Sequence, residues 1–378
     1  MPTPVTAPQI IAHVTNRIGF IELNRPEALN ALSLPMVRAM RAALDLWRDD
    51  AHVIAVVVLS HGVLHGNARA FCAGGDVRLL HDAFRAGEPH TVEQFFIDEY
   101  RLDHAIFTYP KPYIALMNGV TMGGGMGIAQ GAAHTGGLRV VGEASRLAMP
   151  ETRIGLFPDV GISWFLARVP GALGRYMAVT GEAIGAADAL RAGLADLCIA
   201  EGTWPALMAQ LQAQPFEDAR AVVAWLRQQA LRSPPDPQPL PQAMIDLHFS
   251  QPDVPHILAS LHQAQKAGNA NETRQAWLAQ TLNVLRERSP LSMAVSLEML
   301  RRAAGSSFSD CLRRDLVAAC ASFARGDVME GVRARLIDKD NQPRWRITDG
   351  MEVSADLLAS MFDSPWPAGE HPLRDLQD

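Results

Sequence analysis

Two glycine-rich turns follow apolar, strand-like stretches, and they are the first candidates for chemistry in this sequence. AFCAGGDVRLL (residues 70–80) comes after HVIAVVVLS, and TMGGGMGIAQ (residues 121–130) comes after KPYIALMNG. A strand that ends in glycines and opens a helix leaves main-chain N–H groups unpaired at the helix start. Two such turns in one α/β unit can direct these groups at a single oxygen, the geometry of an oxyanion hole. The alternative is structural, because glycine also permits close approach of strand, turn and helix.

Two carboxylates, Glu151 in MPET and Asp159 in FPDVG, stand eight positions apart with a glycine and a proline between them. A lone acid in a loop is usually solvated or caps a helix, and both alternatives apply here. Leu156 and Phe157 make the surroundings of Glu151 unusually apolar for an acid without a function. A carboxylate in such a place is a candidate general base or nucleophile.

Nucleotide-binding fingerprints do not fit the second glycine turn. Starting from Gly123, the GxGxxG pattern requires a glycine where Ile128 stands, and starting from Gly125 it requires one at Gln130. The pattern GxxxxGK[ST] is absent as well. A net charge of −6 and no basic run argue against a nucleic-acid partner.

The four cysteines are far apart, without CxxC or paired Cys/His spacing, which favours a reducing compartment and no metal site. Cys72 lies in the first glycine turn without a histidine beside it, so we expect a buried filler rather than a nucleophile. The first twenty residues lack the pattern of a secretory signal, and the longest apolar runs are of strand length. We therefore expect a cytoplasmic protein without a membrane partner.

Alternating strands and helices must position these residues. RIGFIELNRP, HVIAVVVLS, KPYIALMNG and LRVVG read as strands, and ALSLPMVRAMRAALDLWRDD reads as a helix with Ser33 as N-cap and Pro35 in its first turn. The pattern predicts an α/β fold with a largely parallel sheet. The proline-rich stretch RSPPDPQPLPQ predicts an extended connector over residues 232–242, followed by a mainly helical lobe over residues 243–378.

The stretches FCAGGDVRLL, NGVTMGGGMG and AMPETRIGLFPDVG occur in this order, and with them the chain resembles the crotonase (enoyl-CoA hydratase/isomerase) superfamily. The resemblance runs from about Asn24 to about Gly193. It resumes in EGVRARLIDKDNQPRW (residues 330–345), which is similar to the branch that hydrolyses 3-hydroxyisobutyryl-CoA and is absent from short hydratases. The resemblance implies a crotonase-like ββα spiral core over residues 1–231 that binds acyl-CoA, with two nearly perpendicular sheets.

The resemblance also implies roles for individual residues. The N–H groups of Gly75 and Gly124 would polarise a thioester carbonyl, so that a side chain on either neighbouring glycine of the GGG turn would displace the oxygen. Glu151 would attack the carbonyl or activate water, and Asp159 would bind a hydroxyl group of the substrate. Glu99, in FFIDEYRLDHA, matches a position that contacts substrate, and a helix-surface acid is the equal alternative.

One absence separates the branches of this superfamily. Hydratases commonly use two glutamates, one of them three positions after the middle glycine, where this chain has Gly127. Thioester hydrolysis needs only an oxyanion hole, a carboxylate and water, so a hydrolase of short β-hydroxyacyl-CoA is the leading hypothesis. An enoyl-CoA isomerase that uses Glu151 alone and a non-catalytic CoA-ester-binding scaffold are the alternatives.

We expect no metal or redox cofactor, with coenzyme A entering as part of the substrate. The resemblance leaves open a homo-oligomer, either a trimer or a hexamer. The stretch GIAQGAAHTGGLRVVG is about four residues longer than the family pattern, and we expect His134 in it to be a loop residue. Ile162 and Trp164 are bulkier than the family pattern and can remodel the acyl pocket.

Overall fold

The computed structural model describes residues 7–237, 239–268, 271–348 and 352–378. The chain divides into two compact units, each assembled from segments that are distant in the sequence. One, here called the sheet unit, contains Met1–Gly75, Arg101–Leu147 and Ile184–Gln238. The other, here called the helical unit, contains Asp76–Tyr100, Ala148–Ala183 and Pro239–Asp378.

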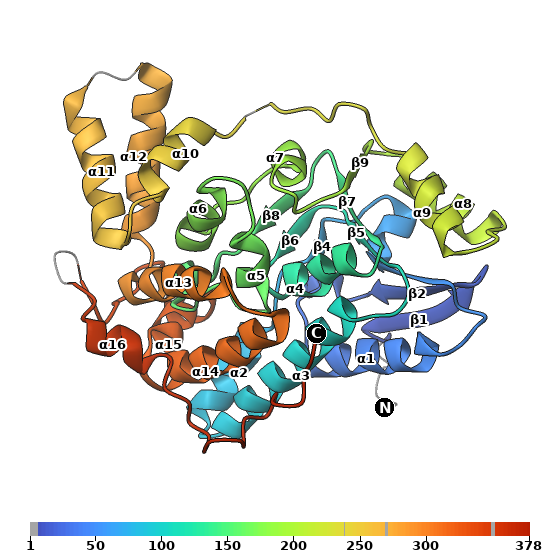
Figure 1. The fold of residues 1–378 in the computed structure, drawn as a ribbon, viewed down its shortest axis with the longest axis horizontal. Helices are drawn as coiled ribbons and strands as arrows, with labels where there is room; N and C mark the ends of the chain where they lie inside the picture. Colours follow the sequence, from blue (N-terminus) through green and yellow to red (C-terminus); the bar gives the residue numbers. More distant parts are fainter. Residues whose placement is uncertain (1–6, 238, 269–270, 349–351) are drawn as a thin grey trace. The chain divides into compact units, whose positions relative to one another are not determined.

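Within the described residues, the larger sheet has six strands in the order β1-β2-β3-β5-β7-β9 (Figure 1). β1 pairs antiparallel with β2, and the other neighbours pair in parallel. The strands are β1 (Ile10–Thr15), β2 (Ile18–Leu23), β3 (Ala55–Ser60), β5 (Tyr113–Met117), β7 (Leu138–Gly142) and β9 (Leu197–Ile199). The largely parallel sheet and the four strands predicted from the sequence are thereby confirmed.

A smaller sheet of the described chain has the order β4-β6-β8, and its strands are β4 (Ala70–Cys72), β6 (Val120–Met122) and β8 (Arg146–Ala148). β4 and β6 run in parallel. Each of these two strands leads directly into one of the glycine turns, so the pairing sets both turns at the same end of the sheet.

Apolar burial explains why these segments form the sheet unit. All six residues of β3 are buried, as expected for a strand covered on both faces. α8 (Trp204–Ala213) and α9 (Ala219–Gln228) pack Trp204 and Trp225 into the same core as the strand residues. α1 (Leu34–Arg48) begins at Ser33, whose side chain accepts a hydrogen bond from the N–H of Met36, as predicted.

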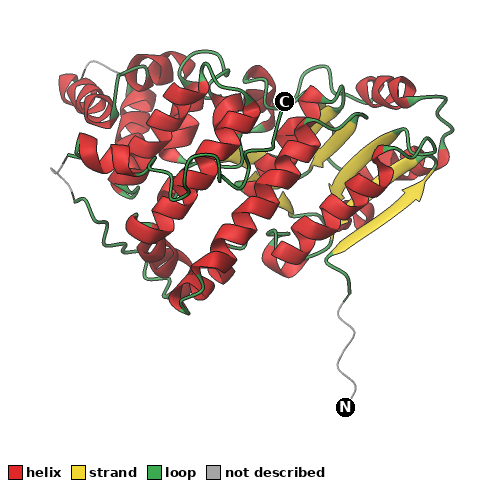
Figure 2. Cartoon of the chain, turned by 60° about the horizontal axis from the view of Figure 1, so that its bottom comes forward, coloured by secondary structure: helices red, strands yellow, loops and turns green. Residues whose placement is uncertain are grey.

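The helical unit is made almost entirely of helices (Figure 2). Asp253, Asn271, Ser289 and Ser307 each cap a helix start with a side-chain oxygen. The unit contains α2 (Val77–Arg85), most of α3 (Pro89–Phe107), η4 (Glu151–Ile154), α5 (Ile162–Leu166), α6 (Leu173–Thr180), α10 (Gln242–Phe249), α11 (Val254–Ala267), α12 (Glu272–Arg286), α13 (Pro290–Ala303), α14 (Phe308–Arg325), α15 (Val328–Val332), the π-helical turn η5 (Arg333–Ile337) and α16 (Ala355–Ser360). The predicted helical character of the chain after the connector is confirmed.

The two compact units of the structure differ from the core, connector and helical lobe that the sequence predicts. The boundary between Gln238 and Pro239 falls inside the predicted connector, but residues 76–100 and 148–183 group with the C-terminal helices. The described part of the connector has neither helix nor strand until α10 begins at Gln242. As a statement about function, the three-part division remains a prediction.

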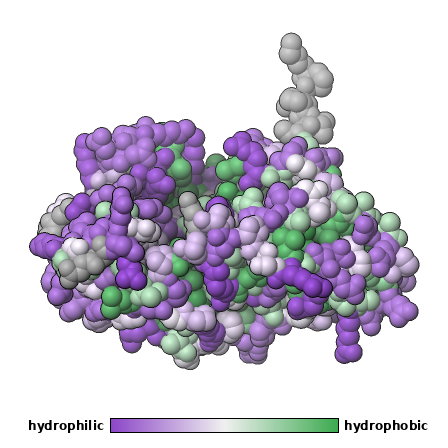
Figure 3. All heavy atoms as spheres, turned by 90° about the horizontal axis from the view of Figure 1, so that it is seen from above, coloured by the Kyte–Doolittle hydropathy of each residue, from purple (hydrophilic) through white to green (hydrophobic). Residues whose placement is uncertain are grey.

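Polar side chains dominate the face drawn in Figure 3, with apolar residues scattered among them. Large apolar side chains that remain exposed in the described chain are separate from one another in sequence: Val14, Leu29, Leu46, Leu79 and Leu247. Among the described helices, none has both the length and the apolar character needed to cross a bilayer.

Candidate active site

The two glycine turns lie against each other in the sheet unit. A Cβ atom built on Gly74 would stand 3.4 Å from the carbonyl oxygen of Met122 and 3.7 Å from the nitrogen of Gly124. Gly74 has a φ of +112°, and its carbonyl accepts a 2.7 Å hydrogen bond from the N–H of Leu32. The turn that contains Gly74 and Gly75 therefore packs against the turn that contains Gly124.

The candidate donors in these turns are not used within the fold. α4 (Gly124–Gln130) begins at Gly124, and the N–H groups of Met126 and Gly127 both reach back to the carbonyl of Gly123. In the described chain, the N–H groups of Gly75 and Gly124 make no hydrogen bond. They are the free donors that a helix start and a tight turn leave available.

The outer glycines of the GGG turn have structural reasons of their own. Gly123 has a φ of +51° with a ψ of −124°, a conformation that residues with a side chain rarely adopt. A Cβ on Gly125 would stand only 2.4 Å from the carbonyl oxygen of Cys72. Strand β4, which is buried, comes close to Gly125. The packing of β4 therefore explains this glycine, and contact with a substrate is not needed to explain it.

The predicted acids lie together in the helical unit, and two further residues join them. Glu99 and Tyr100 are on α3, Glu151 opens η4, and Asp159 precedes α5. Asp315, on α14, completes the group, which we call the acid cluster. All five side chains are buried; Glu151 is 6% exposed, Asp159 5% and Asp315 0%.

Hydrogen bonds in the acid cluster satisfy only some of its oxygen atoms. The hydroxyl of Tyr100 donates to Oδ2 of Asp159 at 2.6 Å, and the N–H of Gly161 donates to Oδ2 of Asp315 at 2.7 Å. One buried oxygen each of Glu99, Glu151 and Asp315 has no hydrogen-bond partner. A buried oxygen without a partner is costly, so these atoms are places where a substrate group or water can bind.

Burial raises the pKa of every carboxyl in the acid cluster, and repulsion by Asp159 raises the pKa of the other three further. Desolvation raises the pKa of Glu151 well above its ordinary range, and the charge of Asp159 adds to this effect. The same two causes act on the pKa of Glu99 and of Asp315. Desolvation raises the pKa of Asp159 from 3.8 to about 6, although the hydrogen bond from Tyr100 opposes this rise. A carboxylate whose pKa is raised in this way is a stronger proton acceptor than an ordinary carboxylate.

Glu151 is fixed by a turn that the C-terminal helices support. The carbonyl of Glu151 accepts a hydrogen bond from the N–H of Leu156, and the carbonyl of Thr152 accepts one from the N–H of Ser289 at the start of α13. A Cβ on Gly331 would meet the main chain of Ile154 at 2.2 Å, so α15 lies directly against η4. The stretch EGVRAR, predicted to mark the hydrolase branch, therefore packs on the turn that carries Glu151.

Sequence reasoning missed Tyr100 and Asp315. The signal for Asp315 was an aspartate at a position of α14 where helical spacing places apolar neighbours such as Leu312 and Ala319. Tyr100 directly follows Glu99 in a helix of mixed apolar and charged residues, and neither residue type alone indicates a hydrogen bond to an acid about sixty positions away. Both assignments required the tertiary structure.

His134 is in the sheet unit, where its ring stacks on Phe107 with centroids 3.9 Å apart. Its Nδ1 atom lies 3.2 Å from the carbonyl oxygen of Phe107. These contacts explain His134 structurally, but His134 ends the 3-10 turn η3 (Gly131–His134), so the prediction of a loop residue was wrong in its secondary structure. Among the described residues, no group of three or more His, Cys, Asp or Glu side chains is arranged to hold a metal ion.

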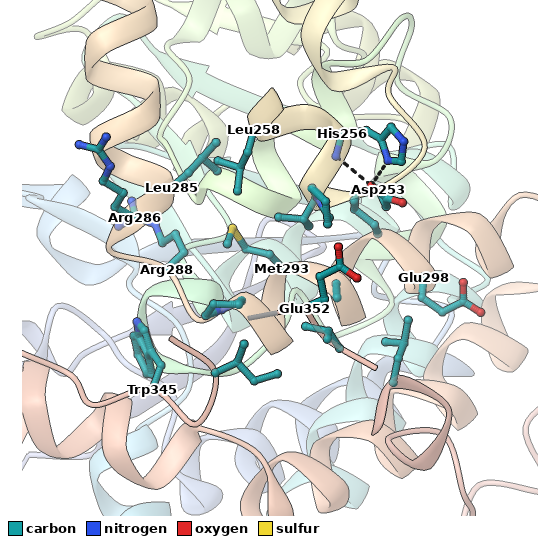
Figure 4. A pocket seen from close by; sticks show the side chains of 18 of the residues that line it. Asp253, His256, Leu258, Leu285, Arg286, Arg288, Met293, Glu298, Trp345 and Glu352 are labelled. Carbon is teal, nitrogen blue, oxygen red and sulfur yellow. Dashed lines mark hydrogen bonds and ion pairs between the residues drawn. The ribbon is translucent and has the colours of Figure 1, made fainter. Parts of the chain in front are cut away.

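A cavity of about 1320 Å³ also lies in the helical unit (Figure 4). Leu258, Leu285 and Met293 give it an apolar wall, and Arg286, Arg288 and Trp345 also line it. None of the predicted site residues, all of which are described, lines this cavity. It is separate from the acid cluster.

The sequence model of the enoyl-CoA hydratase/isomerase family matches residues 18–362. The chain therefore belongs to the enoyl-CoA hydratase/isomerase (crotonase) family, as its motifs predicted. It is 34% identical to the mitochondrial 3-hydroxyisobutyryl-CoA hydrolase of Gallus gallus, over 98% of this chain and 91% of the relative. It is 37% identical to the Xenopus tropicalis protein of the same name, over 92% of this chain and 86% of the relative.

A solved structure described as a carnitinyl-CoA dehydratase from Mycobacterium thermoresistibile matches with a TM-score of 0.84 and 33% identity, over 96% of this chain and 98% of the other. This match over nearly the whole length confirms the predicted crotonase-like fold with its helical C-terminal region.

Proposed function

We propose that this protein hydrolyses the thioester of a short β-hydroxyacyl-CoA, with 3-hydroxyisobutyryl-CoA as the first candidate, in valine and branched-chain breakdown. The observation that carries the proposal is Glu151, a buried carboxyl with one oxygen free of partners and a raised pKa. The names of the relatives support the same activity.

In this proposal, Gly75 and Gly124 donate their free N–H groups to the thioester carbonyl oxygen. The oxygen gains negative charge when its carbon is attacked, and the two donors then bind more strongly than in the ground state. Removal of one such donor typically costs about 2.7–4 kcal/mol of transition-state stabilisation.

Glu151 supplies the attacking group by one of two routes. As a general base it takes a proton from water while the water oxygen bonds to the carbonyl carbon; the C–S bond then breaks, and the thiolate of coenzyme A takes up the proton. As a nucleophile its carboxylate bonds to the carbonyl carbon, the C–S bond breaks, and coenzyme A leaves as the thiolate, which takes up a proton. Water then hydrolyses the acyl-glutamyl anhydride, which releases the free acid and restores the carboxylate of Glu151. Single-turnover reaction in ¹⁸O-labelled water distinguishes the routes, because only the anhydride route can leave label in Glu151.

Asp159 and Glu99 orient the reactants. Asp159 accepts a hydrogen bond from the β-hydroxyl of the substrate, and Glu99 positions the attacking water. Glu99 has one buried oxygen without a hydrogen-bond partner, and burial raises the pKa of both carboxyls, which supports these roles. Ordering of the reacting groups lowers the entropic cost of the reaction.

Gly127 separates this proposal from hydration or dehydration, the activity in the name of the mycobacterial structure. Gly127 is a buried residue of α4 without a side chain, so it offers no second acid at this position. An isomerase that moves a proton with Glu151 alone is the remaining catalytic alternative.

A panel of acyl-CoA esters with detection of free thiol tests the proposal. We expect thiol release from 3-hydroxyisobutyryl-CoA and slower release from esters without the β-hydroxyl. A shifted double bond in an enoyl-CoA without thiol release would support the isomerase instead. Binding of esters without turnover of any kind would support a scaffold.

We further propose that no metal or redox cofactor takes part and that coenzyme A enters only within the substrate. A cytoplasmic location and a trimeric or hexameric assembly also remain proposals; the names of the relatives place those proteins in mitochondria. Fractionation of cells and light scattering of the purified protein test these two points.

A further inference from the structure

The turn that carries Asp159 has an unusual main-chain conformation. Val160 has a φ of +53° and Gly161 a φ of +70°, so two consecutive residues are left-handed. A β-branched residue such as Val160 is a rare occupant of this region, because its side chain crowds the main chain. Such a conformation persists only where the surroundings hold it in place.

α14 supplies the contacts that hold this turn. Oδ2 of Asp315 accepts a 2.7 Å hydrogen bond from the N–H of Gly161, and the turn closes with a 2.9 Å bond from the N–H of Ile162 to the carbonyl of Asp159. Phe308, at the start of α14, fills the space beside Gly161, where a Cβ would stand 2.2 Å from its ring.

Burial of Asp315 costs more free energy than a purely structural contact requires. Its side chain is completely buried, and its second oxygen, Oδ1, has no partner. The charged groups that act on it are Asp159, which repels its negative charge, and Arg314, which has a weaker opposite effect. A buried carboxylate beside a second carboxylate costs more than a neutral acceptor would.

We propose that Asp315 is a positioning residue that holds the carboxylate of Asp159 where it can receive the β-hydroxyl of the substrate. This inference rests on the proposed function, because it assigns the same hydroxyl contact to Asp159. Tyr100 holds the side chain of Asp159 through its 2.6 Å hydrogen bond, and Asp315 holds the main chain two residues further on. Discrimination between hydroxylated and plain acyl groups therefore depends on a residue that touches neither of them.

Without the contact from Asp315, residues 160 and 161 are free to relax toward a right-handed conformation. This relaxation displaces the carboxylate of Asp159 but leaves η4 and Glu151 supported by α13 and α15. Hydrolysis of a hydroxylated ester must then suffer more than hydrolysis of an ester that makes no contact with Asp159.

The experiment compares kcat/KM for 3-hydroxyisobutyryl-CoA and for isobutyryl-CoA in three variants. Asp315→Ala should lower the value for the hydroxylated ester about 10- to 100-fold, the range expected for a displaced positioning group, with a much smaller loss for isobutyryl-CoA. Asp315→Asn retains an oxygen acceptor for the N–H of Gly161, so it should preserve most of the preference for the hydroxylated ester.

Asp246→Asn is a matched control. Asp246, on α10, accepts a 2.8 Å hydrogen bond from the N–H of Ala172, next to Gly171 with its φ of +66°. This contact is likewise a bond from an aspartate to the main chain of a turn with a left-handed glycine, but this turn has no predicted site residues, so the preference should stay at the wild-type value. Thermal unfolding and circular dichroism check that each variant is folded. If Asp315→Ala does not fold, Asp315→Ser carries the same comparison.

Equal losses on both esters in Asp315→Ala, or an unchanged preference, would overturn the inference while leaving the proposed function intact. A wild-type protein that releases thiol from neither ester would instead overturn the proposed function. If the wild-type protein hydrolysed both esters equally, the proposed contact between Asp159 and the β-hydroxyl would be contradicted, and the inference would fail with it.

Discussion

Tyr100 donates its phenolic hydrogen to Oδ2 of Asp159 across 2.6 Å, and both side chains are buried. Burial raises the pKa of Tyr100 well above its ordinary value, so the phenol stays protonated and remains a donor at neutral pH. Its hydrogen bond lowers the pKa of Asp159, while burial raises that pKa to about 6. Tyr100 thus helps to keep a carboxylate ionised in surroundings that favour the neutral acid.

Tyr100→Phe should raise the pKa of Asp159, because it removes the hydrogen bond that stabilises the charged form. We expect the acid limb of the kcat/KM profile for a β-hydroxyacyl-CoA to move to higher pH, with activity partly regained above neutrality. Tyr109→Phe is the control, since that hydroxyl donates to the carbonyl of Leu44 in the sheet unit. Identical pH profiles for Tyr100→Phe and wild type would contradict the prediction.

Glu151→Gln should lower the rate of thiol release about 10²- to 10⁴-fold, the usual contribution of a general base, while the affinity for the acyl-CoA changes little. The raised pKa of Glu151 implies that the wild-type rate falls with decreasing pH well above the ordinary range of a glutamate. Stopped-flow rates from pH 5 to 9 and calorimetric titration with an unreactive thioether analogue measure the two effects. Turnover at the wild-type rate in Glu151→Gln would exclude this residue.

Asp159→Asn should make the fold more stable at neutral pH. Asp159 holds its proton up to a pH of about 6 when folded but only to about 3.8 when unfolded, so its contribution to stability falls as the pH rises through this window. Each unit of difference between the folded and unfolded pKa values corresponds to about 1.4 kcal/mol of stability that the wild type loses as the pH rises. Asparagine does not ionise, so the variant keeps its stability over the same pH range. Urea unfolding from pH 4 to 8 should show the advantage of the variant growing with pH; an advantage that shrank would reverse the assigned direction.

Gly125→Ala should destabilise the protein, because its new methyl group meets the carbonyl oxygen of Cys72 at 2.4 Å. Overpacking of this kind costs about 1–3 kcal/mol. Gly305→Ala is the control, since nothing lies within 4 Å of a Cβ at that position. Denaturant unfolding compares the two variants, and equal stability would show that β4 can move away from the turn.

Local patterns in the sequence predicted much of this fold. The β-branched run of β3 and the Ser33–Pro35 start of α1 are short-range signals, and both elements form as expected. The short strands β4, β6 and β8 have three residues each, too few for a period to emerge. Their pairing depends on contacts between distant segments.

The candidate site divides in the same way. Glycine turns and acids in apolar surroundings can be recognised in the sequence, and Gly75, Gly124 and Glu151 are such cases. The contact of Asp315 with the turn of Asp159 joins segments more than 150 positions apart. Nothing in the local composition of α14 indicates which loop its aspartate reaches.

The helices after the proline-rich connector have a consequence for any shortened form of this protein. A polypeptide severed at residue 238 would keep Gly75, Glu99, Gly124, Glu151 and Asp159, yet lose Asp315 together with the α13 and α15 contacts to η4. We expect water to solvate the exposed carboxyls and their pKa values to return to the ordinary range, so that the shortened protein is inactive. The C-terminal helices are therefore needed to hold the catalytic carboxyls in their buried positions.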